Sequence, residues 1–423
     1  MGQRYEVRKG ELLAGCEVKP ELFGDVRGRL REFVEPFAHT LCRAEQKRYT
    51  LQYVEGLLSD LESKNAESIA YLHGLDRKTM QHFIGESPWE TAPLVDELAR
   101  QVGAEIGEAD GVIVVDPSAH EKRGDESVGV KRQWNGRLGK VDNCQVGIYL
   151  GYASRKEHAL VDERLFLPAE WANDKRRRRK CGVPKEVRFQ TRHELALEML
   201  RAHARRLPHA WVAGDDEMGR PAWFRASLRS MRAQYLLGAP ANTAIRDLEG
   251  RAPPWSGTGR RPKRRLEQMQ AWVAHRPAGA WTEIEVRQGE KGPIVVECLA
   301  RRVQARTDER RIGPEELLFV TRERMGETVR HDYYLGNAPP DTPLKELARV
   351  AKAEHRIEEC LQRAKGEAGL SDHEVRTWVG WHHHQVLALM AVWFLTRHTS
   401  WGKKADAGDH GATGQDGDRV AAA

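Results

Sequence analysis

Two short apolar runs that each lead into an aspartate constrain this chain more than any other feature. Val112–Val115 precedes Asp116 directly, and Ala210–Ala213 precedes Asp215 after one glycine. Runs of four apolar residues bounded by turn residues are typical of buried strands. The sequence therefore predicts two buried strands with one carboxylate at the end of each.

The elements between and after these strands follow a defined order. Two further strands are expected after the first, and a helix begins at Thr191, where Thr191 and Glu194 form a capping-box pattern. The order is then three strands, helix, strand, helix, strand, which is that of the ribonuclease H-like fold. In that fold the first and fourth strands lie side by side, so Asp116 and Asp215 would be neighbours. The remaining predicted elements are the strands Gln145–Tyr152, Ala159–Leu167 and Tyr235–Gly238, and a helix around Pro221–Arg232.

A third acid comes late in the chain. The amphipathic segment Pro343–Ala368 predicts a helix that carries Glu358 and Glu359. Hard cations prefer oxygen ligands, so two strand-end acids and one acid on a neighbouring helix could hold a pair of Mg²⁺ or Mn²⁺ ions. A single aspartate that ends a strand is more often a turn or helix cap. Here, however, three acids occupy the positions that one fold requires. Together they favour a site that cuts phosphodiester bonds.

The pattern along the chain predicts an α/β protein of several parts, because 423 residues exceed one ordinary core. We expect a ribonuclease H-like mixed-sheet core interrupted by a β-rich insertion and preceded by an all-α N-terminal domain. The insertion is predicted from alternating segments such as Trp281–Arg287 and Ile294–Cys298, which favour a small antiparallel sheet. The expected parts are a helical domain at 1–105, the core at 106–243 and 344–401, the insertion at 244–343 and a disordered tail at 402–423.

Basic residues are bunched rather than evenly spread. The 68 Lys and Arg exceed the 62 Asp and Glu by only six, so net charge alone indicates little about partners. Two dense runs predict a surface for a polyanion, with solvated loops as the alternative. Their members are Lys175, Arg176, Arg177, Arg178, Arg179 and Lys180 in the first run, and Arg260, Arg261, Lys263, Arg264 and Arg265 in the second.

Other features exclude several classes of protein. The six cysteines show no C-x-x-C spacing, which argues against a zinc knuckle or a disulfide framework. No apolar run reaches the roughly 18 residues of a membrane span, and Met1–Glu6 does not begin a signal peptide, so we expect a cytoplasmic protein without membrane contact. His382–His384 cannot converge on one ion from a regular helix, so structural or phosphate-facing roles are favoured.

Four segments together resemble the DDE transposases of bacterial insertion sequences. They begin at Val114, Lys131, Trp211 and Glu354 and read VVDPS, KRQWNGRLGKVDNCQ, WVAGDDEMG and EHRIEECLQRAK. The resemblance implies two metal ions, with Asp116 bridging both, Asp215 binding one and Glu358 the other. The family's lysine, seven residues after the catalytic glutamate, matches Lys365.

The chain departs from the family pattern at two positions before Glu358, and it offers three consecutive acids as the second ligand. The hairpin-forming branch has Arg four and Tyr seven residues before the glutamate, where this chain has Glu354 and Ala351. Asp215, Asp216 and Glu217 are consecutive, and each could ligate a cation. The family alignment favours Asp215.

The function implied by the resemblance is transposition. The enzyme would cut the ends of an insertion sequence and join them to target DNA, acting as a homodimer on inverted-repeat ends. Arg356 and Lys365 would contact DNA, and Tyr333 or Tyr334 would stack on a flipped base unless both merely pack the insertion's sheet. The alternatives are a non-mobile nuclease or resolvase of the same fold, which cuts without joining, and a domesticated, catalytically silent DNA-binding protein.

Overall fold

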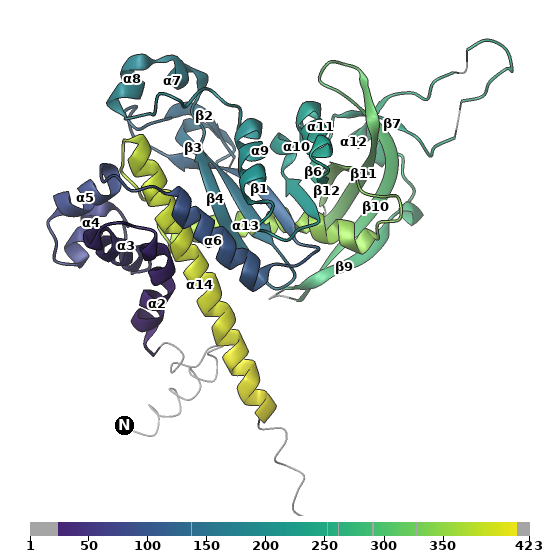
Figure 1. The fold of residues 1–423 in the computed structure, drawn as a ribbon. Coiled ribbons are helices and arrows are strands. Elements are labelled where there is room, and N and C mark those ends of the chain that lie inside the picture. Colours follow the sequence, from purple (N-terminus) through teal and green to yellow (C-terminus); the bar gives the residue numbers. More distant parts are fainter. Residues whose placement is uncertain are drawn as a thin grey trace, which may run out of the picture.

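The computed structural model describes residues 24–412 except 137, 252, 261, 290, 291 and 327; the side chains of 288, 289, 325 and 401–412 are not described. Within these residues the chain is a mixed α/β protein built on one large sheet of 12 strands. Along the main path the strands follow the order β2-β3-β1-β5-β6-β12-β11-β10-β7-β8, while β4 pairs with β3 and β9 with β10. Figure 1 shows helices α2–α6 at one side of the molecule and strands β9–β12 at the other.

The described N-terminal part is helical, and its helices pack against the rest of the chain. Side chains cap several of them, as Asn65 does by accepting from the Ser68 amide at 2.9 Å. Phe33 contacts Phe394 with ring centroids 5.4 Å apart, and Trp89 stacks on His383 at 3.5 Å. These helices therefore share one apolar core with the sheet. They are α2 (Val26–His39), α3 (Ala44–Leu57), α4 (Ala66–Leu72), α5 (Arg77–Gly85) and α6 (Ala92–Ile106).

The strands around the predicted acids pair as their order in the chain anticipated. β1 lies between β3, which is antiparallel to it, and β5, which is parallel to it, and β6 continues the sheet parallel to β5. β2 was not predicted, because its five residues include only one apolar side chain, Trp134, and so lack the alternation that indicates a strand. The bounds are β1 (Val112–Glu121), β2 (Lys131–Asn135), β3 (Lys140–Ala153), β4 (His158–Leu165), β5 (Trp211–Gly214) and β6 (Gln234–Gly238).

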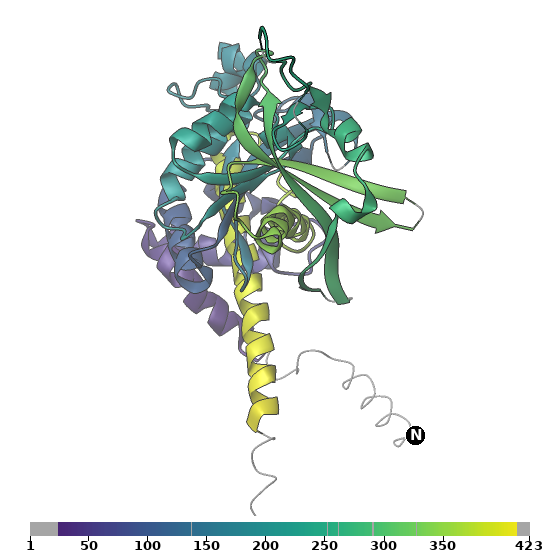
Figure 2. The ribbon, with the colours of Figure 1, turned by 90° about the vertical axis from the view of Figure 1, so that its right-hand side faces the viewer.

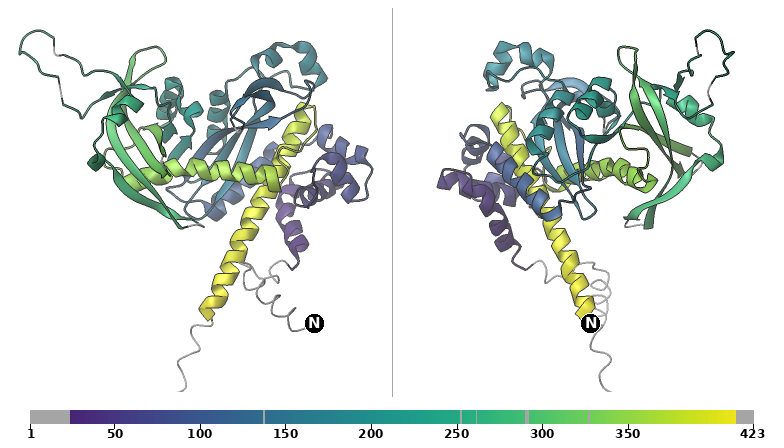
Figure 3. Two further views of the ribbon diagram at one scale, coloured as in Figure 1. Left: turned by 180° about the vertical axis from the view of Figure 1, so that it is seen from behind. Right: turned by 45° about the vertical axis from the view of Figure 1, so that its right-hand side comes forward.

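Helices cover both faces of this part of the sheet. Neighbouring strand residues point to opposite faces. On β4, Asp162 contacts His203 of α9 at 2.8 Å, whereas Glu163 contacts His382 of α14 at 3.2 Å. α9 and α14 therefore cover opposite faces, as Figures 1 and 3 show. The helices of this region are α7 (Ala169–Asn173), α8 (Lys175–Lys180), α9 (Arg192–His203), α10 (Asp216–Gly219) and α11 (Ala222–Ser230).

The strands of the predicted insertion extend the same sheet instead of forming a separate one. β12 pairs with β6, with Tyr334 opposite Gly238. A second apolar cluster, which includes Met269, Trp272 and Leu335, forms on this part. The elements are β7 (Ala244–Asp247), β8 (Glu267–Gln268), α12 (Met269–Ala274), the 3-10 helix η2 (Ala278–Ala280), β9 (Thr282–Gly289), β10 (Gly292–Arg306), β11 (Ile312–Met325) and β12 (Thr328–Gly336).

Two long helices complete the described chain. α13 (Leu344–Glu367) crosses the sheet and reaches the strands of the insertion, where Figure 2 shows it end-on. α14 (Trp378–Ala412) runs between the N-terminal helices and the sheet. Its described backbone runs to 412, within the segment 402–423 for which the sequence predicts a disordered tail. Residues 413–423 lie outside the described residues. Among the described helices none is long and apolar enough to cross a membrane.

Candidate active site

Asp116 and Asp215 lie side by side, as the strand order predicted. β1 and β5 are parallel and Val115 pairs with Gly214, so Asp116 of β1 and Asp215, which follows the last residue of β5, lie at the same level. Adjacent strands are about 4.8 Å apart, which brings the two carboxylates within reach of one another. Asp116 is also opposite Tyr149 on β3, and the Tyr149 hydroxyl donates to Gln385 of α14 at 2.7 Å. The side chain of Asp116 therefore faces the layer of α13 and α14.

The acids of α13 face the two aspartates. Glu354 and Glu358 are one helical turn apart and share a face of the helix. Burial raises the pKa of Glu354 well above its usual value, and the negative charges of Asp215 and Asp116 raise it further. Glu358 keeps 58% of its side chain exposed and lies 3.6 Å from His355. The charges of Asp116 and Asp215 therefore act on Glu354, a residue that the sequence did not single out as a ligand.

Negative charge dominates this cluster. Burial raises the pKa of Asp116 well above its usual value, and Asp215 and Glu358 add to the shift. Burial likewise raises the pKa of Asp215 to about 7. Lys365 offsets part of this charge from the same face of α13, where its Nζ donates to the Ala119 carbonyl at 3.0 Å.

The three consecutive acids after β5 have different surroundings. Asp215 caps α10, with its Oδ1 accepting from the Met218 amide at 2.8 Å. Asp216 is exposed and lies 3.4 Å from Arg220. Glu217 pairs with Arg192 of α9 at 2.5 Å. Among these three, Asp215 is the residue at the strand end beside Asp116.

Comparison with known proteins decides the family. A family model described as DDE superfamily endonuclease matches residues 36–293, more than half of the 423-residue chain. The chain belongs to the DDE superfamily of endonucleases. It is also 36% identical over 99 residues to the "Probable transposase for insertion sequence element IS701" of Microchaete diplosiphon. That match covers 22% of this chain and 25% of the relative.

The donor set of this DDE endonuclease fits a hard divalent cation. Asp116, Asp215, Glu354 and Glu358 supply only carboxylate oxygens, which Mg²⁺ and Mn²⁺ prefer. A cation would also relieve the repulsion that raises the pKa values of Asp116 and Glu354. In the part of the chain that is described, no three His, Cys, Asp or Glu side chains are already arranged as a metal-holding group.

The first basic run of the endonuclease forms the short helix α8, which Asp174 caps. Three of its cations are used within the protein. Arg178 donates to the carbonyls of Pro184 at 2.7 Å and Val187 at 2.9 Å. Arg177 lies over the ring of Trp171, 3.6 Å from its centroid, and Lys180 pairs with Glu126. Those on the exposed side of the helix are Lys175, Arg176 and Arg179.

The second basic run lies between β7 and β8. Arg260, Lys263 and Arg265 are exposed, while Arg264 donates to the Asp247 carbonyl at 3.0 Å. Arg261 lies outside the described residues. Most of the run is therefore available to an external anion.

The aromatic candidates of the insertion differ in exposure. Tyr334 is 7% exposed and packs against Phe319 with ring centroids 6.1 Å apart, which is the packing alternative. Tyr333 is half-buried beside the second apolar cluster. Trp255, in the loop that carries the second basic run, is 43% exposed. The sequence did not single it out, because it lies in a segment without the periodicity of a helix or strand.

The histidines of α14 have internal partners. His383 contacts the carbonyls of Ile84 at 2.9 Å and Trp89 at 2.8 Å. His384 contacts the Tyr53 hydroxyl at 2.9 Å. Both are buried and tie α14 to neighbouring segments, which is the structural one of the two roles that the sequence favoured.

Proposed function

We propose that this DDE endonuclease is a DNA transposase with a ribonuclease H-like core. It would cut the ends of an insertion sequence and join them to target DNA. The observation that carries the proposal is the meeting of two strand-end aspartates with the acidic face of α13. The likeness of 99 residues to a probable insertion-sequence transposase supports it.

In this proposal Asp116, Asp215 and Glu358 hold two Mg²⁺ or Mn²⁺ ions. When bound, the ions would lower the pKa of an attacking water or DNA 3′-hydroxyl and neutralise charge on the phosphate. The charges of Asp215, which follows β5, and of Glu358 on α13 both act on Asp116. Lys365, held beside Asp116 by the Ala119 carbonyl, would face the scissile phosphate's negative charge.

The rest of the chain is assigned roles around that site. The helices of 1–105 would bind the DNA end, and the insertion, 244–343, would hold DNA phosphates through the exposed cations at 260–265. α8 would add a second cationic surface. Two copies acting on paired DNA ends would complete the assembly.

Single Asp116→Ala, Asp215→Ala and Glu358→Ala variants test the metal site. We expect each to lower Mg²⁺-dependent cleavage of an element end about 10³-fold or more, because several kcal/mol of charge stabilisation would be lost at about 1.4 kcal/mol per tenfold. DNA affinity measured in chelator should change little. Asp216→Ala is the matched control and should cut nearly normally, since Asp216 points to Arg220.

The products distinguish the activities. Joined product from a 3′-hydroxyl end and a target plasmid supports transposition, whereas cutting without joining would make the protein a nuclease of the same superfamily. Near-normal cleavage by the Glu358→Ala variant would exclude Glu358 as the third acid.

A further inference from the structure

A small pocket beside α13 is lined by cations. Its volume is about 150 Å³, and it lies between the β3–β4 turn, β9 and α13. The charged side chains that line it are all basic, while the remaining lining residues are small or apolar. The lining consists of Ala153, Ser154, Arg155, Val286, Arg287, Arg349, Lys352, Ala353 and Arg356.

This pocket lies on a different side of α13 from the acids. Arg349, Lys352 and Arg356 are at positions i, i+3 and i+7 and so share one side of the helix. At about 100° per residue, Glu354 and Glu358 lie roughly opposite that side. The pocket is therefore a site separate from the candidate active site.

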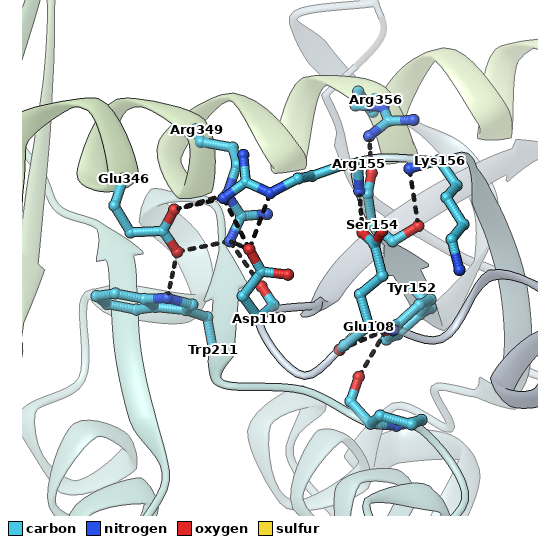
Figure 4. A network of polar contacts seen from close by, with 11 residues as sticks. Glu108, Asp110, Tyr152, Ser154, Arg155, Lys156, Trp211, Glu346, Arg349 and Arg356 are labelled. Atoms are coloured by element: carbon cyan, nitrogen blue, oxygen red, sulfur yellow. Dashed lines mark hydrogen bonds and ion pairs between the residues drawn. The ribbon is translucent and has the colours of Figure 1, made fainter.

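Carboxylates hold two of the arginines in place from outside the pocket. Arg349 donates to the two carboxylate oxygens of Glu346 at 2.8 and 2.6 Å and to the Asp110 carbonyl at 2.6 Å. Arg155 donates to Asp110 Oδ2 at 2.9 and 2.7 Å. Trp211 in turn donates to Glu346 at 3.0 Å. Figure 4 shows this network. Guanidinium groups fixed in this way need little reordering to bind an anion.

Arg356 approaches the pocket from the next part of α13. Its guanidinium donates to the Ser154 carbonyl and contacts His158 at 3.3 Å, and Glu157 is 3.9 Å away. Burial lowers the pKa of Arg356, although Glu157 opposes the shift; the positive charge of Arg287 lowers it further. Lys352 pairs with Glu323, which does not line the pocket. Neighbouring carboxylates therefore compensate part of the positive charge, and an anion in the pocket would reduce the repulsion that remains.

We propose that this pocket binds a phosphate group, and that in the working enzyme it is a backbone phosphate of a DNA segment away from the cleaved bond. A volume of about 150 Å³ has room for one phosphate group. Planar guanidinium groups match phosphate oxygens in geometry as well as charge. The DNA source rests on the proposed function; a free phosphate is the other source of the same chemistry.

The test uses the full chain carrying Arg287→Gln and Lys352→Gln together, which leaves the Asp110–Glu346 network intact. The control is Lys345→Gln, an exposed cation on α13 that does not line the pocket. Binding of a fluorescent duplex is followed by anisotropy across a salt series in chelator. Loss of one phosphate contact should weaken binding of all sequences and reduce the slope of log K against log salt by about 0.9. The control should keep the wild-type slope.

A second measurement identifies the source. At low ionic strength, inorganic phosphate should raise the melting temperature of the wild type more than that of the double variant. A reduced slope supports a DNA phosphate with or without this effect, and an unchanged slope with loss of the phosphate effect assigns the pocket to a free phosphate. If neither changes in a variant with a wild-type melting curve, the pocket is not a phosphate site. Cleavage by the wild type is scored separately, so a failed pocket and a failed transposase proposal give different results.

Discussion

At the residue scale, the acid cluster contains one more carboxylate than the family pattern supplies. Glu354 takes the place where the hairpin-forming branch has an arginine, and its pKa is raised by burial and by Asp215 and Asp116. Glu358 remains the residue at the family spacing from Lys365, but it is more exposed and is paired with His355. The spacing of the motif therefore favours Glu358, while the electrostatics show that Glu354 shares the same field.

This cluster should make the metal-free protein less stable as pH rises. Burial raises the pKa of Asp215 from 3.8 to about 7. A group whose pKa is higher in the folded state contributes stability at low pH, and this contribution is lost as pH rises through the folded value. In chelator, the melting temperature of the wild type should fall between pH 4 and 8 relative to that of a variant without this carboxyl group. The comparison cancels the opposite contribution of buried histidines such as His384, whose pKa burial lowers to about 3. Mg²⁺ should reduce the fall because it favours the charged carboxylates.

Asp215→Asn removes the titrating group without changing its size. Its melting temperature in chelator should fall less over the same range than that of the wild type. Identical slopes for the two proteins would show that Asp215 is not the group responsible.

At the scale of single elements, α8 shows that a run of like charges can contain two kinds of residue. Arg178 serves the fold, because its guanidinium satisfies the carbonyls of Pro184 and Val187. Arg176 and Arg179 lie on the exposed side of the same helix. The composition of the run could not separate these roles, since they depend on which side of the helix packs against its neighbours.

The two kinds of arginine should respond differently to neutralisation. Arg176→Gln combined with Arg179→Gln should leave the melting temperature unchanged and flatten the salt dependence of DNA binding by about 0.9 per lost contact, equally for all sequences. Arg178→Gln should instead destabilise the protein by about 1 kcal/mol, because two part-buried carbonyls lose their donor. Denaturant unfolding and anisotropy check the two effects. If the double variant keeps the wild-type salt slope, Arg176 and Arg179 face solvent and do not contact DNA.

At the scale of the whole molecule, one continuous sheet joins the candidate active site to the insertion. β6 pairs with β5 on one side and with β12 on the other. Gly238 of β6 packs against the backbone of Asp215 and Asp216, where an added Cβ would lie 2.6 Å from the Asp216 amide nitrogen. Gly219 at the end of α10 approaches the Gly238 carbonyl in the same way. Glycines at this junction therefore fix the distance between the second acid and the start of the insertion.

Gly238→Ala should shift Asp215 and lower the cleavage rate on the order of 10²-fold, the effect of a displacement of about 1 Å at a reacting group. DNA affinity should be nearly unchanged. Gly366→Ala on α13 is the control, because nothing lies near its added Cβ and alanine favours a helix by roughly 0.5–1 kcal/mol. Cleavage by Gly238→Ala at the rate of the control would contradict this role for the junction.

The sequence by itself determined the parts that depend on local pattern. The strand runs before Asp116 and Asp215, the capping box at Thr191 and the helical period around Glu358 are all set by neighbouring residues, and the structure has strands and helices there. The adjacency of β1 and β5 also followed, because the order of elements restricts how their strands pair. Motif spacing gave the family, which the comparison confirmed.

Only the tertiary structure decided which charged side chains act on one another and which surfaces are exposed. The approach of Glu354 to the aspartates, the burial of Tyr334 and the cationic pocket beside α13 each join segments far apart in the chain. The pairing of β6 with β12 made the insertion part of the main sheet, although its local alternation is equally compatible with a separate one. Local patterns specify an element and its apolar face, but the partner of that face depends on packing the whole chain.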